Sequence, residues 1–229
     1  MLNVLHRCYR ALMARETVNF IAWKSAYAGK WARWCNQHRS KNLFDHPRDL
    51  HAHVMEMQML RGPLNYLEFG VHKGESIVWW LAKNKHPESR FVGFDSFRGL
   101  PVDWRAGFPK GHFATNGKTP DIQDERCSFE VGWFHETLPR FVRQFSSENP
   151  TVINLDADLY GSTLLVLCLL VGTLKKNDVV ILDDFSDSLH VFRAFLDFVS
   201  SYPVEYDLVA QHPRYNRIAV QIRDLPTPT

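Results

Sequence analysis

Residues 64–76 have the sequence Leu64-Asn-Tyr-Leu-Glu-Phe-Gly-Val-His-Lys-Gly-Glu-Ser76, an apolar run followed by a glycine-containing turn and the start of a helix. Such near-continuous apolar runs predict strands buried on both faces, as in a parallel sheet covered by helices. Gly70 and Gly74 would let the backbone approach a ligand closely, near the free N–H groups of the helix start. The third glycine of the dinucleotide-binding pattern GxGxxG is missing, which disfavours NAD.

Three further apolar runs also end in an acid, at residues 91–95, 152–156 and 179–183. In a parallel sheet the ligand crevice lies outside the carboxyl ends of the strands, so a side chain just past a strand points toward it. Acids crowded there raise one another's pKa unless cations or hydroxyl groups receive them. The four runs therefore predict an active site that contains Glu68, Asp95, Asp156 and Asp183.

The rest of the chain alternates predicted helices and strands. Helices are expected at about 75–85, 137–145, 163–174 and 189–200, with a further strand at about 127–131. The last two strands, at about 206–210 and 218–222, are joined by a link so short that they must pair antiparallel. Residues 61–229 are thus predicted to form an α/β domain with a doubly wound, mostly parallel seven-stranded sheet and a C-terminal antiparallel hairpin.

Residues 1–60 differ from the rest because basic side chains outnumber acidic ones. Aromatic side chains recur there at steps of three and four, the spacing of one helix face: Phe20, Trp23, Tyr27, Trp31 and Trp34. The preferred interpretation is an N-terminal helical extension that packs on the main domain or on a second subunit, the latter case giving a homo-oligomer. The alternative is a helix that binds a membrane surface or nucleic acid.

Composition narrows the possible classes of protein. The 229 residues are 45% hydrophobic, enough for a sizeable core, and the formal net charge of +2 gives no argument for nucleic-acid binding. The four cysteines are scattered, which fits the cytoplasm better than a disulfide framework. The most apolar stretch, residues 164–171, is too short to cross a bilayer, so stable membrane insertion is not expected.

The first two strand ends predict a nucleoside site. An acid in the position of Asp95 can accept hydrogen bonds from both hydroxyl groups of a ribose. Together with Glu68 and Gly70, it makes an adenosine-containing cofactor the expected ligand.

The later strand ends predict the chemistry. Asp156-Ala-Asp158 follows one strand and Asp183-Asp184 follows the next. If those strands are neighbours, their carboxylates meet and suit a magnesium-like cation, which prefers oxygen ligands. Asp158 is either a third ligand in place of Asp156 or the general base that deprotonates a hydroxyl group, and the pattern leaves both roles open.

The long stretch from Ser96 to Arg126 is rich in Gly, Pro and Asp and has no sustained period. Loops of this length are uncommon inside domains and often act as lids. We expect a mobile lid whose apolar cover comes from Trp104, Phe108 and Phe113.

Five motifs, in this order, resemble the macrocin O-methyltransferase family: Glu68-Phe-Gly-Val71, Gly93-Phe-Asp-Ser-Phe-Arg-Gly-Leu-Pro101, Gly132-Trp-Phe-His-Glu-Thr-Leu-Pro139, Asp156-Ala-Asp-Leu-Tyr160 and Asp183-Asp184. Members are class I S-adenosylmethionine-dependent enzymes with a Rossmann-like sheet that methylate sugar hydroxyls on natural products with the help of a magnesium ion. The last pair is often Asp-Glu in relatives, and Asp-Asp is an equally competent ligand pair.

The resemblance implies roles for individual residues. Glu68 would lie near the methionine portion of S-adenosylmethionine, Asp95 on its ribose, and Gly132 and Trp133 beside its adenine. Neighbours in the same motifs complete the expected cofactor site: Gly70, Gly74, Ser76, Ser96, Phe97 and Asp156. The expected metal ligands are Asp156, Asp158, Asp183 and Asp184, and the expected catalytic residues are Asp158 and Asp156.

The predicted function is therefore a metal-assisted O-methyltransferase that acts on a hydroxyl of a sugar or other natural-product small molecule. One alternative is an NAD-dependent sugar oxidoreductase, since the ribose acid and the glycine turn suit both. The other is a non-catalytic adaptor that holds a membrane or a partner through the basic N-terminal helix.

Overall fold

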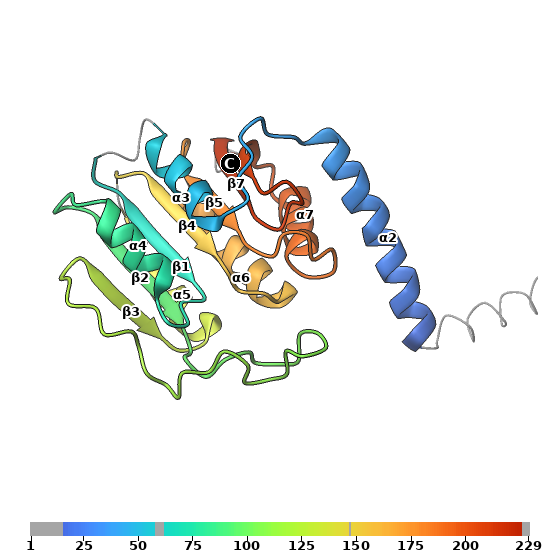
Figure 1. Ribbon diagram of the computed structural model, residues 1–229, viewed down its shortest axis with the longest axis horizontal. Helices are drawn as coiled ribbons and strands as arrows, with labels where there is room; N and C mark the ends of the chain where they lie inside the picture. The colour runs from blue at the N-terminus through green and yellow to red at the C-terminus, as the bar shows by residue number, and fades with distance from the viewer. Residues whose placement is uncertain (1–15, 58–61, 147, 226–229) are drawn as a thin grey trace, which may run out of the picture. The chain divides into compact units, whose positions relative to one another are not determined.

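Seven strands form one sheet in the part of the chain that the structure describes, residues 16–57, 62–146 and 148–225 of a computed structural model (Figure 1). In sheet order they are β3 (Cys127–Val131), β2 (Arg90–Asp95), β1 (Asn65–Phe69), β4 (Thr151–Leu155), β5 (Val179–Leu182), β7 (Ile218–Asp224) and β6 (Glu205–Gln211). The strands from β3 to β5 are parallel, whereas β7 pairs antiparallel with β5 and β6. This confirms the predicted doubly wound sheet with its C-terminal hairpin.

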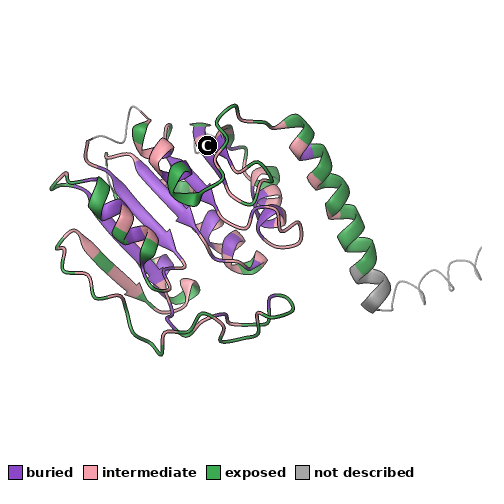
Figure 2. Cartoon of the chain, in the orientation of Figure 1, coloured by how far each residue is buried: buried purple, intermediate pink, exposed green. Residues whose placement is uncertain are grey.

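One face of the sheet is covered by α3 (Pro47–Glu56) and α4 (Glu75–Lys83). The ring of Tyr66 on β1 stacks on Trp80 of α4, with ring centroids 4.8 Å apart. Leu50 and Val54 of α3 belong to the same fully buried cluster. Figure 2 shows the central strands almost wholly buried beneath these helices.

The other face is covered by α5 (Phe134–Gln144), α6 (Tyr160–Leu170) and α7 (Val191–Ser201), which lie side by side in that order. Phe69 reaches this face because it is three residues after Tyr66 and side chains alternate along a strand. Its ring packs edge-on against Phe134 at the start of α5. The two faces therefore share the apolar residues of β1, which explains its near-continuous apolar run.

Two helices begin earlier than their apolar spacing predicts. Helix α5 starts at Phe134, where the Trp133 N–H donates to the Glu136 carboxylate at 3.0 Å and satisfies a donor at the helix end. Helix α6 starts at Tyr160 and gives way to a 3₁₀ turn, Val171–Thr173. Periodicity marks only the apolar positions of a helix, so it misses a polar first turn.

The chain divides into two compact units, one ending at Arg39 and one beginning at Ser40. The predicted boundary near residue 60 is therefore misplaced, because α3 belongs to the second unit. Its residues Leu50 and Val54 are buried in the main core, and the backbone of Phe44 donates to Gln211 O at 3.0 Å. These contacts are made with residues far along the chain, and a local composition change does not reveal them.

The first unit contains α2 (Glu16–Gln37), which confirms a helix over the predicted aromatic stripe. Trp31 stacks on Trp34 within it, and Trp34 stacks on His38. Trp23 is half exposed. The side chain of Phe20 lies outside the described residues. Among the described helices, none has the length and apolar character needed to cross a membrane.

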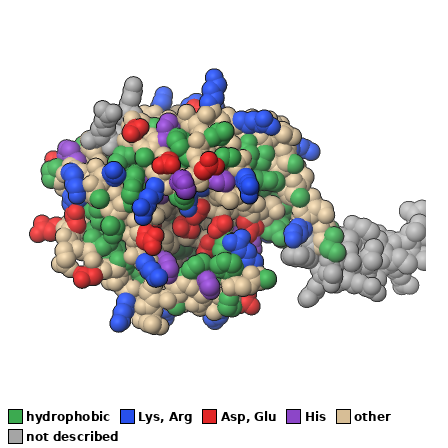
Figure 3. All heavy atoms as spheres, in the orientation of Figure 1, with side chains coloured by type: hydrophobic (Ala, Val, Ile, Leu, Met, Phe, Trp, Pro, Cys, Tyr) green, Lys and Arg blue, Asp and Glu red, His purple; other side chains and the backbone are tan. Residues whose placement is uncertain are grey.

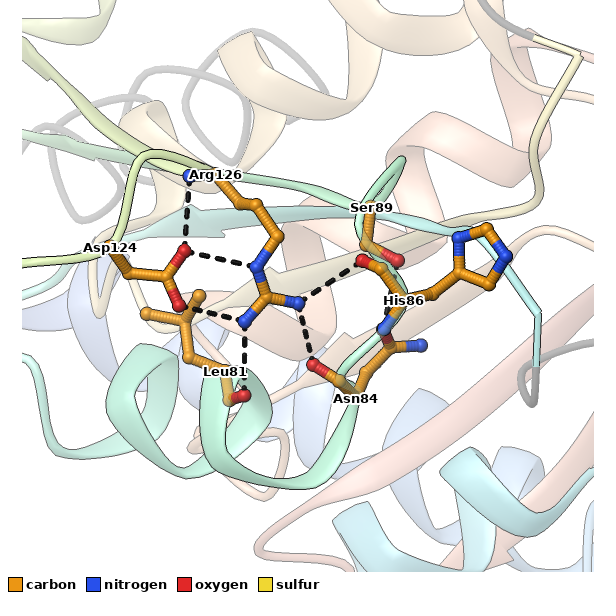
Figure 4. Close-up of polar contacts among 6 residues, drawn as sticks. All are labelled: Leu81, Asn84, His86, Ser89, Asp124 and Arg126. Carbon is orange, nitrogen blue, oxygen red and sulfur yellow. Dashed lines mark hydrogen bonds and ion pairs between the residues drawn. The ribbon is translucent and has the colours of Figure 1, made fainter.

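The C-terminal end of the 96–126 loop is held by Arg126 (Figure 4). Its guanidinium donates to the carbonyls of Leu81, Asn84 and His86 at 3.3, 2.8 and 3.2 Å, and to the Asp124 carboxylate at 2.7 Å. Two of those carbonyls belong to the end of α4, where a cation is favoured by the helix dipole. The C-terminal end of the loop is therefore anchored to the end of α4.

Candidate functional site

A cavity of about 870 Å³ opens at the carboxyl ends of the parallel strands. Figure 3 shows acidic side chains around a hollow on this face of the molecule. Most of the predicted site residues line the cavity: Gly70, Asp95, Ser96, Gly132, Trp133, Asp156, Asp158, Asp183 and Asp184. The prediction that strand order would bring these residues together is therefore correct.

The other predicted residues lie elsewhere. Glu68 and Ser76 line a second cavity of about 610 Å³, on the side of the sheet covered by α3. Of the described residues assigned to the cofactor site, Gly74 and Phe97 line neither cavity. The two cavities adjoin, because Gly70, His72 and Asp156 line both.

Gly70 brings the turn after β1 into close contact with the end of β4. Its φ of 90° favours glycine, and a Cβ atom placed there would lie 1.9 Å from the carbonyl oxygen of Asp156. Gly74 also has a positive φ, but its Cβ would meet Pro120 of the 96–126 loop at 2.8 Å. Close approach at Gly70 thus shapes the cavity, whereas at Gly74 it serves the packing of that loop.

Asp95 bonds to the protein's own backbone. One carboxylate oxygen accepts the N–H groups of Val71 and His72, both at 2.9 Å, and the other accepts the N–H of Phe97 at 2.7 Å. From its place at the end of a buried strand, Asp95 was expected to bond to a ligand and not to the protein, and these three backbone bonds correct that expectation. Asp95 ties the turn after β1 to the loop after β2, and Phe97 is buried within that loop.

Glu68 is inside β1 and not beyond its end, since the strand continues to Phe69. It is two residues after Tyr66 and therefore faces α3 and α4. Burial raises the pKa of its carboxyl group to about 8, an effect that the neighbouring Tyr66 hydroxyl only partly offsets. A cationic ligand at this point would favour the ionised form.

Four carboxylates gather at the ends of β4 and β5, which are adjacent parallel strands. Burial raises the pKa of Asp156 well above its usual range, and the charges of Asp183 and Asp158 raise it further. Burial, with the charges of Asp184 and Asp183, raises the pKa of Asp158 to about 7. The pKa of Asp184 is raised for the same reasons. The neighbouring carboxylates thus raise one another's pKa, as the sequence predicted.

Two arginines that sequence reasoning missed lie against these acids. The Arg217 guanidinium forms an ion pair with Asp183, and Arg105 of the 96–126 loop lies 3.8 Å from Asp184. Arg217 arrives there because β7 pairs with β5 so that Ile218 lies opposite Leu182. No local sequence motif marks either arginine. The predicted C-terminal hairpin was the sole sequence signal that could have placed Arg217 near the end of β5.

The acids do not form a metal-coordination shell as they stand. In the described ranges of the chain, no three His, Cys, Asp or Glu side chains are arranged to hold a metal ion. Asp183 is engaged by Arg217, and Asp184 faces Arg105. The predicted metal ligands are thus brought together, but two of them already have cationic partners.

The 96–126 loop covers part of the cavity. Trp104 is buried with Leu100 and Leu159, and Phe108 packs against the group. The Trp104 indole N–H donates to Asp187 at 3.2 Å, and the Arg105 guanidinium lies 3.7 Å from the centre of the Trp104 ring. Phe113 is the most exposed of the three expected aromatic residues. Of these three aromatic residues, Phe113 alone lines the cavity, and the loop's other apolar lining comes from Leu100, Pro101 and Val102. Closure of the loop as a mobile lid stays a prediction.

Known proteins with similar sequences or folds agree with this arrangement. Residues 43–211 match the family described as Macrocin-O-methyltransferase (TylF). The 8-demethyl-8-(2,3-dimethoxy-alpha-L-rhamnosyl)-tetracenomycin-C 4'-O-methyltransferase of Streptomyces olivaceus is 29% identical over 156 residues. That alignment spans 57% of this chain and only 58% of the relative.

Solved structures share the fold. The O-methyltransferase NovP has a TM-score of 0.60 and 20% identity, covering 77% of this chain and 79% of its own. An O-methyltransferase from Bacillus cereus, solved in complex with SAH, has a TM-score of 0.53 and 11% identity, covering 96% of this chain and 97% of its own. Neither the oxidoreductase nor the adaptor alternative finds support among these proteins. The family match runs from the residues before α3 through β6, and the chain belongs to the macrocin O-methyltransferase family.

Proposed function

We propose that this protein transfers a methyl group from S-adenosylmethionine to a hydroxyl of a sugar or other natural-product small molecule. The observation that carries the proposal is the larger cavity, which brings the nucleoside-type positions Gly70 and Asp95 together with the acids after β4 and β5. Family membership supports methyl transfer. The rhamnosyl-tetracenomycin relative supports a glycosylated acceptor, and the complex of the Bacillus cereus protein with SAH supports the donor.

The donor would extend along the strand ends. A carboxylate offers about four lone-pair sites, and three at Asp95 are used by backbone N–H groups, which leaves one for a ribose hydroxyl. Gly132 and Trp133 border the adenine in this proposal, and Ser96 lines the cavity beside Asp95. The sulfonium would lie near Gly70 and Asp156, where the two cavities adjoin.

Asp158 is proposed as the general base. An acceptor oxygen attacks the sulfonium methyl in line, the new O–C bond forms as the S–C bond breaks, and the hydroxyl proton passes to the Asp158 carboxylate. A pKa of about 7 suits this role, because a large fraction of the base is then ionised at neutral pH and is still basic enough to take a proton. Asp156 is the alternative base, and burial with the charges of Asp183 and Asp158 raises its pKa well above the usual range of an aspartate.

A magnesium ion at Asp156, Asp183 and Asp184 is a separate proposal. It is supported by the hard oxygen ligands that β4 and β5 bring together. It requires Asp183 to leave Arg217 and Asp184 to turn from Arg105, so ion binding and these ion pairs would compete. When bound, such an ion would lower the pKa of an acceptor hydroxyl.

Calorimetry with S-adenosylmethionine and NAD in parallel tests the class of cofactor. We expect binding of the first alone. Incubation with radiolabelled S-adenosylmethionine and a panel of rhamnosylated natural products should then label a hydroxyl group. Binding of NAD alone would support the oxidoreductase alternative, and binding of neither would contradict the proposal.

A further inference from the structure

Phe113 of the 96–126 loop combines two features that cost stability. Its φ of 67° is a conformation that bulky residues rarely adopt, because the side chain then crowds the backbone. Its side chain is also 37% exposed, so part of an apolar ring stays open to solvent. Phe97 in the same loop has a similar φ of 55° but is 1% exposed, and burial of its ring offsets the strain. Phe113 gains less from burial, which indicates a functional reason for its conformation.

Neighbouring rings fix the orientation of Phe113. Its ring centroid lies 4.3 Å from that of His112 and 5.6 Å from that of His72, and both pairs are T-shaped. The ring of Phe108 lies 5.8 Å away on the same loop. The backbone just before Phe113 is also held, because the N–H of Leu100 donates to the carbonyl of His112 at 2.9 Å. A ring that is held in this way and lines a cavity is a preformed contact surface for a ligand.

The position of Phe113 relates it to the acceptor. Phe113 lines the larger cavity and not the second one. It contacts His72, which lines both cavities, so it lies close to the place where they adjoin and where the sulfonium is proposed to lie. The donor's adenine is assigned elsewhere, beside Gly132 and Trp133. The group that reaches the sulfonium from the larger cavity is therefore the acceptor.

The larger cavity offers two kinds of surface to this acceptor. The four carboxylates after β4 and β5 can accept hydrogen bonds from hydroxyl groups. Phe113, Pro101 and Val102 of the loop supply an apolar wall, and Val102 is 55% exposed. A pyranose ring has hydroxyl groups around its edge and C–H bonds on its faces, so it can use both surfaces at once. Several carboxylates suit a ring with several hydroxyl groups better than they suit a phenol.

We infer that Phe113 is the residue on which the pyranose ring of the acceptor stacks, so that the loop recognises a glycoside by the C–H face of its sugar. The acids hold the hydroxyl groups of the same ring, and Phe113 sets the distance of that ring from the donor. The inference rests on the proposed function, because it assumes a sulfonium donor beside this part of the cavity. Phe113 binds and positions the acceptor and takes no part in bond breaking.

The test measures one ligand for each part of the site. S-adenosylhomocysteine reports on the donor site by calorimetry, and methyl α-L-rhamnopyranoside, which carries the type of sugar named in the Streptomyces olivaceus relative, reports on the acceptor site. The rhamnoside is titrated into the protein saturated with S-adenosylhomocysteine and is followed by saturation-transfer NMR. Phe113→Gly should weaken the rhamnoside about tenfold or more, the effect of losing an apolar ring contact, and should leave S-adenosylhomocysteine within about twofold.

Three variants separate binding from folding. In Phe113→Gly the thermal midpoint should change little, because glycine suits the positive φ and the relief of strain offsets the lost ring contacts. Phe113→Tyr keeps an aromatic ring and should bind the rhamnoside within about twofold of the unmodified protein. Phe108→Leu is the matched control, since Phe108 is on the same loop but does not line the cavity, and both ligands should bind it normally.

The outcomes distinguish this inference from the proposed function. Unchanged rhamnoside affinity in Phe113→Gly, or equal weakening of both ligands, would overturn the role of Phe113. Absence of rhamnoside binding to the unmodified protein would overturn it as well, while binding of S-adenosylhomocysteine left the donor site standing. Failure to bind S-adenosylhomocysteine would overturn the proposed function. If Phe113→Gly does not fold, Phe113→Asn replaces it with the same expected results, because asparagine also tolerates this φ.

Discussion

At the scale of single residues, burial and neighbouring negative charges raise the pKa values of the carboxyl groups in the site. Asp158 has a φ of 56°, a conformation that aspartate and asparagine tolerate better than most residues. Its neighbours Asp184 and Asp183 add negative charge to a buried position, so its ionised form is disfavoured. The crowding that disfavours the ionised carboxylate thus brings the pKa of Asp158 close to neutral pH.

The pH dependence of transfer follows from that pKa. The base must be ionised to accept a proton, so the methylation rate should rise through a pKa of about 7 and level off above it. Asp158→Asn, which suits the same backbone conformation, should lower kcat about 10²–10⁴-fold with donor affinity unchanged. Rate profiles from pH 5.5 to 9 and titration calorimetry measure both. A flat profile in the unmodified protein, or an active Asp158→Asn, would remove Asp158 as the base.

Asp95 has both a structural and a ligand-binding role in our interpretation. Asp95→Ala leaves the N–H groups of Val71, His72 and Phe97 without their acceptor, which should lower the free energy of unfolding by about 1–3 kcal/mol. It should also weaken S-adenosylmethionine about tenfold or more, because the loops that frame the ribose loosen. Urea unfolding and calorimetry test the two effects. Unchanged stability would mean that the three backbone bonds contribute little.

At the scale of elements, the 96–126 loop lines part of the cavity and is held by contacts at its end and in its middle. One end of the loop is held by Arg126, which donates to carbonyl groups at the end of α4. The middle of the loop contacts the segment just before α7, where the Trp104 indole N–H donates to Asp187. Arg105 brings a positive charge from the loop to Asp184. We expect this loop, which is held at one end and contacts Asp184 and Asp187, to close over a bound acceptor.

Limited proteolysis tests the lid. Trypsin should cut the free protein at Arg105 or Lys110, and S-adenosylmethionine with an acceptor should slow this cleavage. Trp104→Phe, which removes the N–H bonded to Asp187, should speed cleavage of the liganded protein severalfold with little effect on the global unfolding midpoint. Cleavage that is indifferent to ligands would show that the loop is a static cover.

At the scale of the whole molecule, strand order assembles the acids and their cations. Asp156 and Asp183 meet because β4 and β5 are parallel neighbours, and Arg217 joins them through the antiparallel pairing of β7. The result is an acid cluster that arginines already neutralise in part. Metal dependence is therefore a question of whether magnesium displaces those arginines.

Chelation answers that question. If magnesium is required, excess EDTA should abolish transfer but leave donor affinity nearly intact, added magnesium should restore the rate, and Asp183→Asn should prevent that recovery. Arg217→Lys, which removes the guanidinium paired with Asp183, should then bind magnesium more tightly. Full turnover in excess EDTA would leave acid–base chemistry with arginine partners as the mechanism.

The helix α2 belongs to a unit of its own, and its role as an oligomer contact is still a proposal. Light scattering of the full chain and of a variant with Trp23 replaced by Ser tests it. A dimer that dissociates in the variant is the expected result, because Trp23 is half exposed on this helix. A monomeric full chain would exclude the contact.

The sequence by itself determined the strand pattern, the parallel sheet with its terminal hairpin, and the acids after β4 and β5. These features are local: apolar runs mark buried strands, and strand ends mark the crevice. Tertiary structure alone decided that Glu68 faces a second cavity with His51, that α3 joins the main core, and that Arg217 pairs with Asp183. Each of these depends on contacts between distant parts of the chain, such as Arg217 and Asp183, which are 34 residues apart in the sequence. Periodicity reports which face of an element is apolar, but the partner on that face is set only when the whole sheet is packed.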